Sequence, residues 1–200
     1  MDELSKLPPT VWAAALGALA LGVLLWWAWR WYRGYRARKL LRTQVTGGAA
    51  DHLANALVPD GMGGGFHVDF LLLTMRGVVV IDLRDVRGNI FGGDQMAEWT
   101  VMDGARRFTF TNPQSALYDR IAAVKALVGE FPVEGRLLFS NIGKFTKGMP
   151  KYVMMLDGIE VEFPQVDRSL KGSAALAPFA EVWGRVVPQL KPSPHLFTNL

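Results

Sequence analysis

The sequence predicts an α/β domain, a mixed sheet flanked by helices, preceded by one transmembrane helix. Residues 11–29 contain no charged residue, which is the pattern of a membrane-spanning helix. Short apolar runs rich in β-branched residues follow further along the chain and favour strands. An amphipathic run with helical spacing then separates early strands from late ones. The predicted order of helix, strands, helix, strand, strand and helix is typical of a layered α/β domain.

The charges are distributed unevenly along the 200 residues. Residues 1–42 hold seven Lys/Arg and two Asp/Glu, a net charge of +5, whereas residues 43–200 hold fifteen and sixteen, a net charge of −1. The basic character therefore belongs to the N-terminal arm and not to the folded part. The chain has no cysteine, which excludes a disulfide framework, a thiolate metal site and a cysteine nucleophile.

Residues 11–29 have the length and the flanks of a membrane span. As a helix they extend about 28 Å, close to the roughly 30 Å hydrocarbon core of a bilayer. Trp12 lies at one end, and an aromatic belt followed by basic residues lies at the other: Trp26, Trp27, Trp29, Arg30, Trp31, Tyr32, Arg33, Arg36, Arg38, Lys39 and Arg42. Aromatic belts of this kind mark the membrane–water interface.

The order of charges predicts the orientation of this helix. A cleaved signal peptide carries its positive charge before the apolar run, but here the charge follows it. The positive-inside rule places residues 1–10 outside a bacterial-type inner membrane and residues 30–200 in the cytoplasm. Residues 30–46 are then a basic juxtamembrane linker on anionic headgroups, so that membrane lipid contacts residues 11–42.

Residues 47–190 are predicted to form the folded domain. A short helix at 49–57 ends at Pro59, and the glycine-rich loop 60–65 follows. Two hairpins come next. One joins strands at 66–73 and 77–85 through a turn at Gly77, and the other turns at Asp103–Gly104. Residues 86–95 between the hairpins are rich in turn-forming residues.

The second half contains the strongest helix signal. Asn112 caps a helix that ends at Gly129, with Pro113 in its first turn and one apolar face formed by Leu117, Ile121, Val124 and Val128. The elements expected after it are a strand at 135–141, a loop at 141–148, a strand at 151–156, a helix at 174–190 interrupted at Pro178 and Pro188, and an irregular tail at 191–200.

Two carboxylates in the first hairpin are the candidates for chemistry. Asp69 and Asp82 lie in strands that pair through a short turn, so their side chains can meet at one end of the sheet. Oxygen ligands of this kind hold Mg²⁺, which can activate water and stabilise charge on a phosphodiester. Arg84 projects from the same strand face as Asp82 and can bind the phosphate. On spacing alone, local pairing of these aspartates with arginines is the simpler interpretation, and His67, on the face of Asp69, is more often a surface residue than a metal ligand.

A longer pattern resembles the nuclease-related domain family, NERD, which is grouped with the PD-(D/E)XK nucleases. It consists of "VDFLLLTMRGVVVIDLRDVRGNIFGG", "EWT" and "FTNPQSALYDRIAAVKAL", within residues 48–140. The resemblance implies a restriction-endonuclease-like core. It also implies that Asp69 and Asp82 are metal ligands and catalytic acids, with Arg84 at the position of the family's lysine and Asn112-Pro113 as its Asn-Pro.

The chain departs from the family pattern at several of these positions. Arginine replaces lysine at position 84, and arginine is planar and stays protonated. Ala116 stands where the family often has glutamine, Gln114 is displaced, and Asp51 is a loose match to an acid near the first helix. Three functions follow as alternatives: a Mg²⁺-dependent hydrolase acting on DNA or RNA, a non-catalytic binding or scaffold module at the inner membrane, and a structural membrane protein whose domain mediates assembly.

Overall fold

The structure is a computed structural model that describes residues 9–164 and 177–193. The chain forms two compact units, residues 1–43 and 44–200. Helix α1 (Pro9–Thr46) runs through the first unit, and its last residues enter the second, where Val45 is buried. The predicted extracytoplasmic residues 1–8, the residues 174–176 assigned to the last helix and the tail residues 194–200 lie outside the described part.

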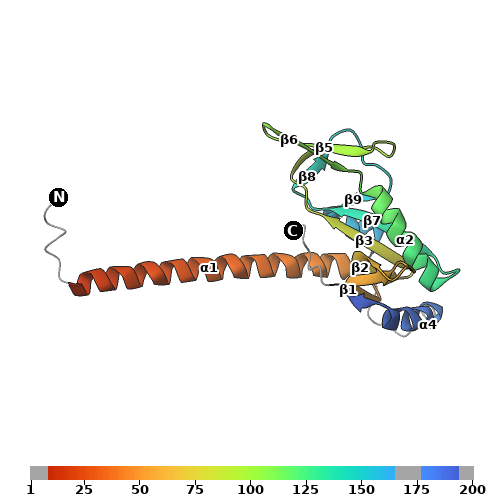
Figure 1. The fold of residues 1–200 in the computed structure, drawn as a ribbon, viewed down its shortest axis with the longest axis horizontal. Coiled ribbons are helices and arrows are strands. Elements are labelled where there is room, and N and C mark those ends of the chain that lie inside the picture. Colours follow the sequence, from red (N-terminus) through yellow and green to blue (C-terminus); the bar gives the residue numbers. More distant parts are fainter. Residues whose placement is uncertain (1–8, 165–176, 194–200) are drawn as a thin grey trace. The chain divides into compact units, whose positions relative to one another are not determined.

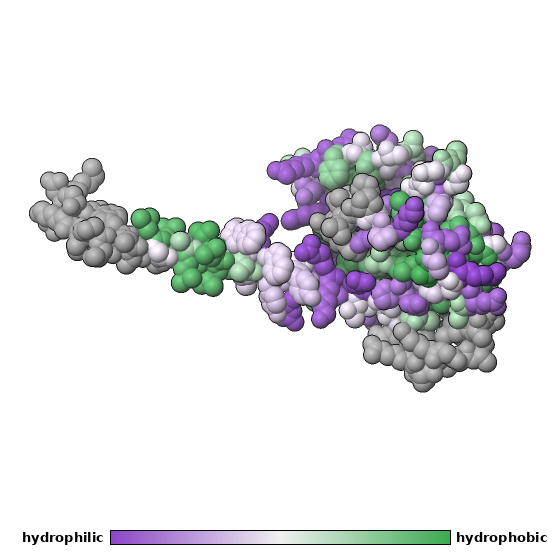
Figure 2. Space-filling view, turned by 60° about the horizontal axis from the view of Figure 1, so that its bottom comes forward, coloured by the Kyte–Doolittle hydropathy of each residue, from purple (hydrophilic) through white to green (hydrophobic). Residues whose placement is uncertain are grey.

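Along α1, residues of different polarity follow one another. Figure 2 shows apolar side chains, then aromatic residues of intermediate hydropathy, then charged ones. Three arginines each stack over an aromatic ring four residues earlier: Arg30 over Trp26, Arg33 over Trp29 and Arg36 over Tyr32. Within the described ranges no helix combines the length and the apolarity needed to cross a membrane. The membrane span at 11–29 therefore stays a prediction.

The second unit contains two sheets (Figure 1). Sheet A has six strands in the order β10-β1-β2-β3-β7-β9. The pairs from β10 to β3 are antiparallel, and those from β3 to β9 are parallel. Its strands in chain order are β1 (Asp51–Pro59), β2 (Gly65–Thr74), β3 (Gly77–Arg84), β7 (Val133–Phe139), β9 (Val153–Met155) and β10 (Lys191–Pro192).

Three strands of sheet B, β4, β5 and β6, lie between β3 and β7 along the chain, and its fourth strand, β8, follows β7. Its four strands have the order β6-β5-β4-β8. The pairs β4–β5 and β5–β6 are antiparallel, and β4–β8 is parallel. Its strands are β4 (Gly88–Phe91), β5 (Glu98–Asp103), β6 (Arg106–Thr111) and β8 (Gly143–Phe145). This mixed α/β arrangement of sheets and helices fits a nuclease-like core.

Helix α2 (Gln114–Val128) packs on one face of sheet A, with α4 (Ala177–Val186) beside it (Figure 1). The side chains of Leu117 and Val124 are fully buried in the core shared with the sheet. Gly135 on β7 allows α2 to approach the sheet closely, because a Cβ at this position would lie 2.5 Å from Ile121 Cδ1. The helix thus brings one side of its surface directly over β2, β3 and β7.

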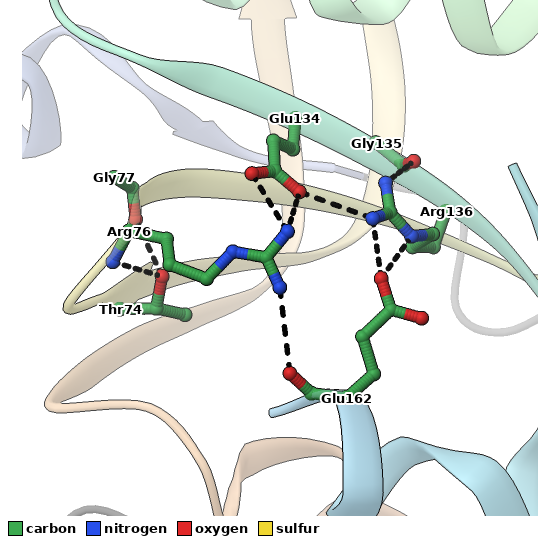
Figure 3. A network of polar contacts seen from close by, with 7 residues as sticks. All are labelled: Thr74, Arg76, Gly77, Glu134, Gly135, Arg136 and Glu162. Atoms are coloured by element: carbon green, nitrogen blue, oxygen red, sulfur yellow. Dashed lines mark hydrogen bonds and ion pairs between the residues drawn. The ribbon is translucent and has the colours of Figure 1, made fainter. Parts of the chain in front are cut away.

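An ion-pair network covers the opposite face of sheet A (Figure 3). The carboxylate of Glu134 on β7 accepts hydrogen bonds from Arg76 and Arg136, at 2.7 and 3.1 Å. Arg136 Nε also donates to Glu162 at 2.6 Å. Both guanidiniums lie near the ring of Phe163. Through Glu162 this network holds the short helix α3 (Ile159–Glu162), which follows the 3₁₀ turn η2 (Leu156–Gly158), against the sheet.

Three sequence-based expectations about secondary structure are wrong. Residues 49–57, predicted as a helix, belong largely to strand β1, which pairs with both β2 and β10. The apolar residues Leu53 and Leu57 have helical spacing, but the sheet hydrogen bonds override this local signal. The predicted loop at 141–148 contains β8, and the predicted irregular tail begins with β10. Both strands are too short to leave a periodic pattern.

The other elements agree with the sequence. The two hairpins form β2–β3 and β5–β6, with their turns at Gly77 and Gly104. Helix α2 ends at Gly129 as predicted, but it begins at Gln114 with Pro113 and not Asn112 at the N-cap, and Asn112 Oδ1 accepts a hydrogen bond from Gln114 N at 2.9 Å. The turn-rich residues 86–95 contain one short strand, β4. Pro188 lies in the 3₁₀ turn η4 (Val187–Gln189), which follows α4.

The two hairpin glycines make a matched pair for a stability test. Gly77 has φ +125°, and an added Cβ would lie 2.4 Å from the carbonyl oxygen of Pro132, whereas Gly104 has φ +60° and open space around it. We expect Gly77→Ala to lower the free energy of unfolding by about 3 kcal/mol and Gly104→Ala by about 1 kcal/mol. Urea denaturation followed by far-ultraviolet circular dichroism measures both. Equal losses would contradict this explanation.

Candidate functional site

The end of the β2–β3 hairpin ladder brings Asp69 and Asp82 together. The last registered pair of this ladder is Phe70 with Ile81, so the next residues on each strand, Asp69 and Asp82, face each other. Side chains in directly opposed positions have Cβ atoms roughly 4.5–5.5 Å apart. Both aspartates point to the face covered by α2, and both are buried, with 8% and 3% of their surface exposed. The predicted convergence of the two carboxylates is therefore observed.

Two arginines compensate the charge of Asp82. Arg84, two residues further along β3, donates from Nη2 to Asp82 Oδ2 at 2.8 Å. Arg120 of α2 places its Nη1 3.5 Å from the same oxygen. Burial raises the pKa of Asp82 to about 6, although both arginines act to lower it, and neighbouring Asp69 raises it further. Removal from water thus outweighs the attraction of two cations.

Asp69 is held by a different set of donors. Its Oδ2 accepts a hydrogen bond from the backbone N–H of Leu83 at 2.8 Å, and its Oδ1 lies 3.0 Å from His67 Nε2. The other ring nitrogen of His67 lies 2.8 Å from Ser193 Oγ. A hydrogen-bonded chain therefore runs from the residue after β10 through the imidazole to Asp69 and the backbone of β3.

Arg120 connects α2 to both acidic strands. Besides contacting Asp82, it donates from Nε to the backbone carbonyl of His67 at 2.5 Å. In the described part of the chain two buried polar atoms, Arg84 Nε and Asn55 Oδ1, have no hydrogen-bond partner. Asn55 lies on β1 between residues paired with Phe70 and Val68, opposite Asp69, and has a left-handed φ of +53°.

This donor set does not fit a magnesium ion. Both oxygens of Asp69 already accept hydrogen bonds, and Asp82 Oδ2 faces two guanidiniums. A divalent cation at the carboxylates would meet the positive charges of Arg84 and Arg120 at close range, where Coulomb repulsion is large. Within residues 9–164 and 177–193, no group of three or more His, Asp and Glu side chains is arranged to hold a metal ion.

Sequence reasoning missed two members of this cluster. Arg120 lies three residues after Leu117 and four before Val124, so it interrupts the apolar face of α2. A charged residue in an apolar stripe is a signal of a buried ion pair and could have identified it. Ser193 carries no such signal, because nothing local indicates that the residue after β10 reaches His67.

The displaced glutamine has a structural role nearby. Gln114 is buried, and its Nε2 donates to Asp94 Oδ1 and to the carbonyl of Lys151, both at 2.9 Å. The backbone N–H of Lys151 donates to the same Asp94 oxygen. The hydrogen bond from Gln114, followed by the one from Lys151, lowers the pKa of Asp94. This network fixes the backbone before β9.

Asp51 does not join the carboxylate pair. Its Oδ2 accepts a hydrogen bond from Trp183 Nε1 at 2.9 Å, which ties α4 to the start of β1. The match of Asp51 to an acidic family position therefore has no counterpart in the geometry around Asp69 and Asp82.

Comparison with known families assigns most of this region to one family. The family model described as "Nuclease-related domain" (NERD) matches residues 33–140, more than half of the chain. The chain belongs to the NERD family. No curated protein and no solved structure matches it significantly. The matched NERD segment includes both aspartates, Arg84 and Arg120, but ends before Ser193.

The raised pKa of Asp82 predicts a pH-dependent stability. The folded state binds this proton more tightly than the unfolded state, whose pKa is near 3.8, since the folded-state pKa is about 6. The stabilisation from Asp82 is therefore full below the lower value and is lost as the pH rises through the higher one. We expect the stability difference between the wild type and Asp82→Asn to fall over this window and to level off near pH 7.

Denaturant titrations from pH 3.5 to 8 measure this difference. Asp94→Asn is a control of opposite sign, because the pKa of Asp94 is lowered and its contribution is lost as the pH falls. If the stability of the wild type relative to Asp82→Asn increased between pH 4 and 6, the raised pKa of Asp82 would be contradicted.

Proposed function

We propose that this NERD protein is a non-catalytic binding or scaffold module attached to the inner membrane. The proposal rests on one observation: cationic side chains and hydrogen-bond donors already occupy the carboxylate pair. Asp82 is paired with both Arg84 and Arg120, and Asp69 accepts hydrogen bonds from the backbone of Leu83 and from His67. Two carboxylates and two guanidiniums balance in charge, so the cluster needs no bound ion to be neutral.

The identity of residue 84 supports the same conclusion. A lysine carries a compact ammonium that can lose its proton and release its partner, whereas arginine stays charged and binds in a planar geometry. Breaking a buried pair by removing one partner costs about 3–5 kcal/mol, because the other charge is left uncompensated. A metal ion at Asp82 would therefore have to offset the loss of the ion pairs with Arg84 and Arg120.

A metal-dependent phosphodiesterase is the second candidate. It is favoured by the family, whose name is nuclease-related, and by the convergence of Asp69 and Asp82 at one end of the sheet. This function requires both arginines to withdraw from Asp82 so that Mg²⁺ has access to its oxygens. The two candidates make opposite predictions about divalent ions.

Titration calorimetry and a hydrolysis assay separate these candidates. The full chain in uncharged detergent is mixed with MgCl₂ or MnCl₂, and with labelled single-stranded DNA, duplex DNA and RNA. Because the arginines occupy Asp82, we expect no metal-dependent hydrolysis and no change in metal binding in Asp82→Asn. Asp85→Asn, at an exposed aspartate three residues further on, is the matched control. Hydrolysis that persists in Asp85→Asn but disappears in both Asp82→Asn and Asp69→Asn would establish the nuclease.

We also propose that α1 attaches the protein to the membrane, with residues 1–10 outside and the folded domain in the cytoplasm. The support is the apolar run of residues 11–29, followed by aromatic residues and by arginines that stack on them. The described leucines of this run, including Leu21 and Leu25, are exposed to solvent. Burying them in lipid removes apolar surface from water.

Membrane attachment is tested by fractionating cells that express the full chain. We expect the wild type to stay in the membrane pellet after alkaline carbonate extraction, and a Leu21→Lys/Leu25→Lys variant to be released, because charges in a hydrocarbon core are unfavourable. Arg36→Lys keeps the charge and is the control. A reporter fused after Leu200 should behave as cytoplasmic. Release of the wild type by high salt alone would contradict insertion.

A further inference from the structure

One face of sheet B is open to solvent and carries a cross-strand row of polar side chains. Lys144 on β8 is registered with Asn89 on β4, Asn89 with Met102 on β5, and Met102 with Arg107 on β6. Registered partners point to the same side of a sheet, and all four residues are exposed. Adjacent strands lie about 4.8 Å apart, so the row extends over about 14 Å.

The opposite face of sheet B is buried over β4 and most of β5, while Phe108 on β6 is exposed. Ile90, Val101 and Trp99 alternate with the residues of the row and belong to the domain core. The rings of Phe110, Phe139 and Phe145 surround Trp99 with centroids 5.8–6.1 Å away. Because this packing fixes the sheet from behind, the exposed row is held on a rigid support.

In the described part of the chain the cations of this open face form no ion pair with an acid, although exposed Glu98 on β5 lies on the same face as Met102. Several arginines elsewhere in the second unit are paired, as in Arg76 with Glu134, Arg87 with Asp103 and Arg120 with Asp82. Across the described ranges, Arg107 and Lys144 have no salt bridge to a carboxylate. Since residues 43–200 carry a net charge of −1, positive charge concentrated on one face is a local feature and not an effect of composition.

An aromatic ring lies beside these cations. Phe91 follows Asn89 by two residues on β4, so it projects from the same face, and it is partly exposed. Lys147 Nζ lies 5.9 Å from the centroid of its ring. Lys147 also lacks a carboxylate partner in the part of the chain that the structure describes. Cations that contact phosphates and a ring on which a base stacks are the combination used to bind single-stranded nucleic acid.

We propose that this open face binds single-stranded nucleic acid, with Arg107, Lys144 and Lys147 contacting phosphates and Phe91 stacking with a base. The face thereby gives the binding module proposed above a partner. It uses no residue of the carboxylate pair, so binding here does not depend on whether that pair hydrolyses anything.

The chemistry of the face favours a single strand over other polyanions. A duplex hides the faces of its bases, and no helix of this face is available to enter a groove. An anionic lipid surface is bound best by side chains that insert into it, whereas this row offers an amide and charged groups, with Met102 as its exposed apolar residue. Duplex DNA and anionic vesicles are therefore used as competing partners in the test.

The experiment measures fluorescence anisotropy of a labelled 20-nucleotide oligothymidylate with the full chain in uncharged detergent and excess EDTA. The test variant is Arg107→Gln/Lys144→Gln/Lys147→Gln. Each phosphate contact with a single strand contributes about −0.7 to the slope of log K against log salt. We expect the variant to bind about tenfold more weakly at low salt, with a slope less steep by about 2.

Two controls separate this face from general charge effects. The variant Lys125→Gln/Arg185→Gln/Lys191→Gln removes three exposed cations from other surfaces, and we expect it to retain the affinity and slope of the wild type. Phe91→Leu should weaken binding several-fold without changing the slope, because stacking releases no counterions. Unchanged thermal unfolding of each variant shows that the fold is retained.

Three results would overturn the proposal. The first is an equal loss of oligonucleotide affinity in both triple variants, and the second is tighter binding of duplex DNA than of the single strand. The third is that Arg107→Gln/Lys144→Gln/Lys147→Gln loses binding to phosphatidylserine vesicles while its oligonucleotide binding is unchanged. The outcome is independent of the non-catalytic assignment. Hydrolysis in Mg²⁺ by a protein that also binds through this face would refute that assignment alone.

Discussion

The interaction on which the centre of the domain depends is the burial of two carboxylates beside each other. Asp69 and Asp82 face one another at the end of the β2–β3 ladder, where water is largely excluded. Two like charges in a low dielectric repel strongly, and burial alone already raises the pKa of Asp82. The sheet tolerates the pair because guanidiniums, an imidazole and a backbone N–H surround it.

Those compensating groups come from elements far apart in the sequence, so the charge cluster also joins the layers of the fold. Arg120 fastens α2 to β2 and β3. Ser193 connects the strand β10 at the edge of sheet A to His67. The network around Arg136 on the opposite face ties α3 to the sheet in the same manner, but it is nearer to solvent and involves glutamates at the protein surface.

Membership of the NERD family favours a nuclease, whereas the side chains around Asp69 and Asp82 favour a site without metal. The family fold supplies the place where two acids converge, and arginine at position 84 with Arg120 from α2 fills that place with positive charge. A nuclease-related scaffold can then act through other surfaces. Among the described residues, the cations on the open face of sheet B have no acidic partner, whereas those of the carboxylate cluster do. The core packing behind sheet B holds this face rigidly, as a binding site requires.

The sequence by itself determined the two hairpins, helix α2 and the approach of Asp69 to Asp82, because turn glycines, helix periodicity and strand alternation are local properties. Only the tertiary structure decided that residues 51–59 form a strand, since Leu53 and Leu57 suit a helix equally well until β2 and β10 pair with them. It also decided the state of the carboxylates. Arg120 contacts Asp82 from 38 residues further along the chain, and Ser193 contacts His67, the partner of Asp69, from 111 residues beyond Asp82. No local pattern encodes contacts of that kind, which form when α2 and β10 dock on the sheet.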